Sequence, residues 1–135
     1  MLFQFTTVAA FLVVVAGAMH PGSYMARLGS PSGAKTPGGM VMVTNAKDVT
    51  LTLSGDNAGG SRAWYVHKGT CKDDRGIVGS NDMFPAFQIS EKGEGRAKAT
   101  LATPLVDGTN YFVAVHASAE DVKTIVACGE LKPEH

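Results

Sequence analysis

The sequence predicts an all-β domain, folded as a Greek-key β-sandwich or a flattened barrel. Short segments of alternating apolar and polar residues recur along the chain, which is the pattern of half-buried strands. Sixteen glycines and six prolines, with few aromatic residues, suit short strands that are joined by many turns. The length of 135 residues is enough for one such domain and too short for two.

Seven segments are predicted to be strands, and no soluble helix is expected between them. In residues 62–67 the alternation places Ala63, Tyr65 and His67 on one face of the strand and Trp64 and Val66 on the other. Residues 68–83 are expected to be irregular, and the charged run at 72–75 is expected to be a solvated turn. The predicted strands are 40–44, 49–54, 62–67, 84–90, 96–102, 110–116 and 124–128.

The first 18 residues indicate export. They carry no charged side chain, and Ala16-Gly17-Ala18 matches the small residues before a signal-peptidase cut that would leave Met19 first. Alternatively, residues 2–19 remain as an uncleaved helical anchor, because a helix of this length spans about 27 Å of a roughly 30 Å hydrocarbon core. Both alternatives place the rest of the chain in a periplasmic or extracellular compartment, with the membrane as a partner in the second.

Residues 19–39 are expected to be a Gly/Pro-rich linker or extended arm that leads into the domain at 40–135. The chain carries twelve basic and twelve acidic residues, and this zero net charge argues against binding to nucleic acid.

The chain has two cysteines, Cys71 and Cys128, and an even count in an exported chain favours one disulfide. The bridge would close a loop of 57 residues, which chain entropy values at about 4 kcal/mol. Two buried free thiols are the alternative. A metal site made by both cysteines is not expected, because neither belongs to a C-x-x-C spacing.

Three segments together resemble the copper–zinc superoxide dismutases. Residues 64–71 (WYVHKGTC) are similar to the strand and turn that carry two copper-binding histidines and the first bridging cysteine. Residues 112–122 (FVAVHASAEDV) are similar to the later strand that ends in another copper histidine, and 127–129 (ACG) to the second half-cystine. Over residues 40–131, the resemblance implies an eight-stranded Greek-key sandwich with Cys71 tied to Cys128.

The departures from this family concern its metal ligands. The first copper histidine of the family falls on Tyr65, while the second and the late one fall on His67 and His116. The segment from Cys71 to Phe84 is too short for the family's zinc loop and contains no histidine. The arginine that guides superoxide in the family is replaced by Ile125. The resemblance therefore implies a degenerate domain that is not an active dismutase.

His67, His116 and Tyr65 could together hold a copper ion, with two imidazole nitrogens and a phenol oxygen as ligands. The alternative is that both histidines are remnants, hydrogen-bonded or solvated at the ends of their strands. Methionines at 19, 25, 40 and 42 suggest a soft Cu(I)-binding surface. Met40 and Met42 share one strand face, however, and simple core packing is the expectation for them.

The leading hypothesis is a non-catalytic module with a structural or interaction role and without a required cofactor. It would be an accessory subunit, on the periplasmic face, of a larger membrane complex. The alternative is a small exported copper-binding protein that uses His67 and His116. Residual superoxide dismutation with copper is the third hypothesis.

Overall fold

The computed structural model describes residues 22–34 and 36–134, and it confirms the predicted all-β class for this part of the chain. The signal peptide or anchor predicted at the N-terminus lies outside the described residues. Within them, no helix is long and apolar enough to cross a membrane. A 3-10 turn, η1, covers Asn81–Met83, and the strands are β1 Tyr24–Leu28, β2 Gly38–Thr44, β3 Asp48–Ser54, β4 Gly60–Thr70, β5 Asp73–Ile77, β6 Phe87–Ile89, β7 Gly95–Thr100, β8 Tyr111–His116 and β9 Ile125–Pro133.

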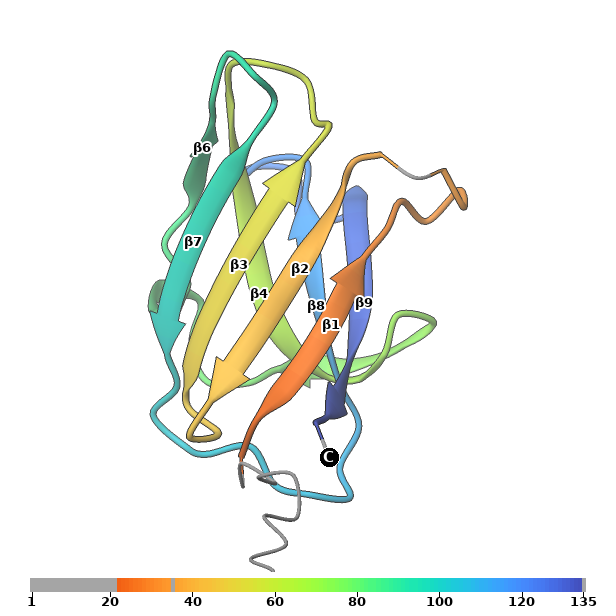
Figure 1. Cartoon of the computed structure of the whole chain (residues 1–135). Coiled ribbons are helices and arrows are strands. Elements are labelled where there is room, and N and C mark those ends of the chain that lie inside the picture. The colour runs from red at the N-terminus through yellow and green to blue at the C-terminus, as the bar shows by residue number, and fades with distance from the viewer. Residues whose placement is uncertain (1–21, 35, 135) are drawn as a thin grey trace, which may run out of the picture.

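The strands form one curled antiparallel sheet in the order β5-β4-β8-β9-β1-β2-β3-β7. In Figure 1 the strands β7, β3, β2 and β1 form the front layer, and β4, β8 and β9 lie behind them. The short strand β6 pairs with the start of β4 and lies beside β7, so it stands between the two ends of the curled sheet.

The core lies between the two layers. The front layer contributes every second residue of its strands, such as Val41 and Val43 on β2 and Leu51 on β3, because side chains alternate across a strand. The rear layer contributes Trp64 and Val113, which are also fully buried. The alternation seen in the sequence thus selects the face that each strand turns inward.

Strands β4 and β8 are buried on both faces. Residues 63–67 of β4 and all six residues of β8 are buried. Their second face, which carries His67 and His116, looks away from the core toward the segments that contain Ile77 and Val122. A strand that is covered on both sides has a nearly continuous apolar sequence, as in WYV of β4 and FVAV of β8.

The expectation of a linker at 19–39 is wrong for residues 24–28, which form strand β1. Tyr24, Ala26 and Leu28 are buried, and β1 pairs with β2 on one side and with β9 on the other. The sequence signal is weak because the segment is short and one inward position is a small alanine. Pairing with β9, roughly a hundred residues away in sequence, completes the strand.

The segment 68–83 is also more regular than expected. Strand β4 continues to Thr70, and Asp73–Ile77 forms the edge strand β5, which pairs with β4 across a bulge. Its residues are mostly exposed and charged, so it lacks the apolar alternation that predicts a strand. Conversely, the strand predicted over 84–90 is limited to Phe87–Ile89.

Met40 and Met42 do not pack into the core, contrary to the expectation for them. Their side chains face outward from β2, and the two residues are 36% and 43% exposed. The neighbouring Val41 and Val43 occupy the inward positions of the strand instead.

Candidate metal site

The structure brings the three predicted ligands together on the outer face of β4 and β8. His67 lies opposite Phe112, Tyr65 opposite Ala114, and Ala63 opposite His116, so the three side chains project from the same face. The ring centroids of His67 and His116 are 5.9 Å apart, and that of Tyr65 is 6.1 Å from His67 and 5.3 Å from His116.

The two imidazoles are buried, and most of their nitrogens lack a well-aligned hydrogen bond. Both histidines are only 4% exposed. Within the described residues, Nε2 of His67 has no hydrogen-bond partner, and no well-aligned hydrogen bond reaches either ring nitrogen of His116, although the backbone of Val122 lies close enough to raise the pKa of His116. Buried polar atoms are nearly always hydrogen-bonded, because leaving one unpaired costs about 1–3 kcal/mol. The protein groups described around these rings therefore do not explain why imidazoles occupy the two positions.

Asp74 orients the first imidazole. Its Oδ1 lies 3.1 Å from Nδ1 of His67 and also accepts a hydrogen bond from the backbone N–H of Gly76. A carboxylate can only accept, so Nδ1 carries the proton and Nε2 presents its lone pair. Histidines that bind metals are typically held by such a carboxylate on the other ring nitrogen.

Burial keeps both imidazoles neutral. It lowers the pKa of His67 below the usual 6.5, although Asp74 acts in the opposite direction. Burial also lowers the pKa of His116, and the neighbouring His67 lowers it further, because two cations at this distance repel each other. A hydrogen bond with the backbone of Val122 and the charges of Asp74 and Asp121 act in the opposite direction. Neutral imidazole is the form that binds a metal ion.

The rings line an open hollow of about 500 Å³. Its wall includes the apolar side chains of Ile77 and Val122 and the carboxylate of Asp74. The lining residues are Tyr65, His67, Asp74, Gly76, Ile77, Gly79, Asn81, His116 and Val122.

The ring spacing suits one shared ion. Two imidazoles that bind one ion through nitrogens at about 2.0–2.1 Å have centroids roughly 4.5–6 Å apart, and the upper end corresponds to a wide N–metal–N angle. The observed separation of 5.9 Å lies in this range. The described residues contain no cluster of three or more His, Cys, Asp or Glu side chains suited to a metal. The side chains gathered here that could bind a metal are therefore two imidazoles with a tyrosine beside them.

Neighbouring contacts hold both histidines in place. The ring of His67 stacks on Phe112, with centroids 4.6 Å apart. Behind His116, Arg62 donates to the backbone carbonyl of Ala117 at 2.8 Å and to both carboxylate oxygens of Asp56. These bonds anchor the segment after β8 to the start of β4.

Sequence reasoning missed Asp74 and the Asp56–Arg62 pair. The run at 72–75 was expected to be a solvated turn, and Asp73 and Arg75 do form an exposed ion pair there. Asp74 points to His67 instead, because β5 folds back along β4. If Asp73, Asp74 and Arg75 form a strand, Asp74 faces the opposite side from its two neighbours, and this alternation could have indicated its role.

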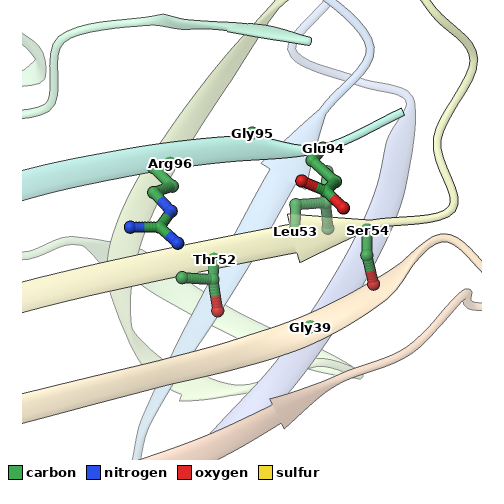
Figure 2. A pocket seen from close by; sticks show the side chains of 7 residues that line it. All are labelled: Gly39, Thr52, Leu53, Ser54, Glu94, Gly95 and Arg96. Carbon is green, nitrogen blue, oxygen red and sulfur yellow. The ribbon is translucent and has the colours of Figure 1, made fainter. Parts of the chain in front are cut away.

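A second hollow, of about 220 Å³, lies on the outer face of β2, β3 and β7. Figure 2 shows Arg96 and Thr52 on one side of it and Glu94 and Ser54 on the other, with Gly95 at its upper edge and Gly39 at its lower edge. All four side chains are exposed, and none of them is a buried group without a partner. The histidine site is therefore the stronger candidate.

No family model, no curated protein and no solved structure matches this chain.

Proposed function

We propose that this chain is a non-catalytic, exported copper-binding protein in which His67 and His116 bind a single ion. The observation that carries this proposal is the set of three buried imidazole nitrogens without a well-aligned hydrogen bond, one on His67 and two on His116, whose ring lies beside the backbone of Val122. A remnant site would be expected to have its histidines hydrogen-bonded or solvated. Here only Nδ1 of His67 has a side-chain partner among the described residues, and that partner prepares Nε2 as a ligand.

The strand order supports a Greek-key barrel of the superoxide dismutase type as the scaffold. Strands β1, β2 and β3 follow one another as hairpins, but the chain then crosses to β4, whose neighbour is β8. Strand β9 returns to lie beside β1. Long connections that skip neighbouring positions in the sheet are characteristic of Greek keys.

The chemistry of the site favours copper binding without turnover. Imidazole suits copper, and the site lies beside a tyrosine in an open hollow. A dismutase of the resembled family needs more histidines than the two present here. The proposed role is therefore to hold or carry the ion.

The test is a titration of the full-length, metal-stripped protein with Cu(II) in the absence of reductant, read by native mass spectrometry. The wild type should bind one copper per chain, and the His67→Ala/His116→Ala double variant should bind none at this site. His20→Ala and His135→Ala are matched controls, because they remove the other two histidines of the sequence. Equal binding by the wild type and the double variant would refute the proposal. Loss of copper in His20→Ala alone would place the site at the N-terminus instead.

The alternative proposal is an interaction module of a membrane complex, and the charge-free apolar residues 2–19 favour it. It predicts that the protein purifies from membranes at full length, together with other subunits, and without copper. A processed, copper-loaded protein in the soluble exported fraction would exclude this alternative.

A further inference from the structure

Three methionines gather on the outer face of the front layer. Met25 on β1 lies directly opposite Met42 on β2, and Met40 is two residues along the same strand, so all three share one face. Met25 is half-buried, and Met40 and Met42 are exposed.

Core packing does not account for these residues. Among the large apolar side chains of the described strands, only Met40 and Met42 are exposed, since the other two exposed ones, Val106 and Val122, lie in loops. The rest of this face is polar, with Thr50 beside Met42 and Thr52 beside Met40 on β3. Three thioethers therefore stand together on a surface that otherwise excludes apolar groups.

The register brings the three side chains within reach of one another. Residues directly opposite on antiparallel strands have Cβ atoms about 4.5–5.5 Å apart, and diagonal neighbours about 7–8 Å, which long side chains can bridge. Met25 and Met42 are such an opposite pair, and Met25 and Met40 are diagonal. Methionine has three rotatable bonds, so its sulfur can turn toward a shared ion without movement of the backbone.

We propose that Met25, Met40 and Met42 form a second metal site, selective for soft monovalent cations of the Cu(I) and Ag(I) class. Thioether sulfur is a soft ligand that selects Cu(I), whereas Zn²⁺ and Mg²⁺ prefer nitrogen, thiolate or oxygen ligands. No histidine or cysteine lies at the paired positions around the three methionines: Arg27 lies opposite Met40, Lys132 opposite Met25, and Thr52 and Thr50 opposite Met40 and Met42. The nearby carboxylate, Glu130, pairs with Lys132. The positive charges of Arg27 and Lys132 also repel a divalent ion more strongly than a monovalent one.

This site is separate from the histidine site. The methionines lie on the outside of the layer formed by β1 and β2, and the histidines on the outside of the layer formed by β4 and β8 (Figure 1). The core lies between them, so one ion cannot use both ligand sets. The evidence for the methionine site does not depend on the copper proposal above.

The test uses Ag(I), a redox-inert probe of soft sites, added to the full-length protein in chloride-free buffer. The protein carries ¹³C-labelled methionine methyl groups. It also carries His67→Ala and His116→Ala, which remove the two imidazoles of the proposed copper site. The methyl resonances of Met25, Met40 and Met42 should shift together and saturate at one equivalent of Ag(I). The resonance of Met83 should stay in place, because Met83 is half-buried and its sulfur already accepts a hydrogen bond from Ser80.

Variants assign the site. Met25→Leu/Met42→Leu keeps the bulk of the face and should weaken Ag(I) binding by at least about tenfold. Met83→Leu is the matched control and should bind as the parent does, and Zn²⁺ should shift none of the three methyl groups. Unchanged binding in Met25→Leu/Met42→Leu, or resonances of the three methionines that do not respond to Ag(I), would overturn the proposal.

Discussion

At the scale of single residues, the hydrogen bond between Asp74 and His67 matters most for the proposed copper site. It fixes which ring nitrogen of His67 carries the proton and which presents its lone pair. No other described group forms a hydrogen bond with a ring nitrogen of His67. Tyr65 and Phe112 complete the orientation through ring contacts with His67. The site thus depends on a carboxylate that binds no metal itself.

Replacing Asp74 by alanine should weaken copper binding by about 10–100-fold, the usual effect of losing a partner of a metal-bound histidine. Competition titration against a chelator of known affinity measures the change. Asp73→Ala is the matched control, because Asp73 pairs with the exposed Arg75 and does not contact His67. Equal effects of the two variants would contradict the role of Asp74.

The lowered pKa values of His67 and His116 predict an acid-sensitive metal-free fold. Unfolded histidine binds a proton near pH 6.5, but the folded protein takes it up only at lower pH. The unfolded state therefore binds more protons over this interval, and the free energy of unfolding falls as the pH drops below about 6.5.

Urea denaturation of the chelator-treated protein between pH 8 and pH 5 measures this dependence. The His67→Gln/His116→Gln variant should lose most of the stability change between these pH values, because glutamine does not titrate. A double variant with the same pH dependence as the wild type would show that other groups are responsible.

At the scale of elements, the turn from β4 to β5 places Asp74 over His67. The two strands pair with a register shift between His67 and Gly69. Gly69 has a φ of +105°, and a Cβ there would lie 2.0 Å from the carbonyl oxygen of Asp73. A side chain at position 69 would thus push β5 away from β4.

Gly69→Ala should destabilise the fold by about 1–3 kcal/mol and should also weaken copper binding, because Asp74 moves with β5. Gly108→Ala is the matched control: its φ is +86°, but no atom lies within 4 Å of the added Cβ. It carries the backbone strain without the clash and lies away from the site. Chemical denaturation and copper titration of both variants separate the two effects, and full copper affinity in a folded Gly69→Ala protein would exclude this role of the turn.

At the scale of the whole molecule, the disulfide between Cys71 and Cys128 connects the β4–β5 turn to β9. The two Cα atoms are 6.2 Å apart across 57 residues of sequence. The bond thereby ties the edge of the sheet near the histidine site to the strand that pairs with β1. An oxidising compartment is consistent with such a bond.

Removing the disulfide with Cys71→Ser/Cys128→Ser should lower the free energy of unfolding by about 4 kcal/mol, mainly because the unfolded chain gains entropy. Denaturation of the wild type with and without reductant provides the comparison, and the reduced wild type should match the variant. A variant as stable as the oxidised wild type would show that packing alone holds β5 and β9 in place.

The sequence by itself determined the all-β class, the positions of most strands, the cysteine pair and the face shared by Tyr65 and His67. These features depend on a two-residue alternation and on cysteine chemistry, which are local properties of the chain. It did not reveal β1 or β5, whose residues lack a strong pattern and become strands through pairing with β9 and β4.

Only the tertiary structure decided that the rings of His67 and His116 lie with their centroids 5.9 Å apart, that Asp74 reaches His67, and that Met25 lies opposite Met42 on the outer face of β1 and β2. Each of these contacts joins segments from different strands. Their geometry follows from register and from the curl of the sheet, which depend on the packing of the whole core rather than on any one segment.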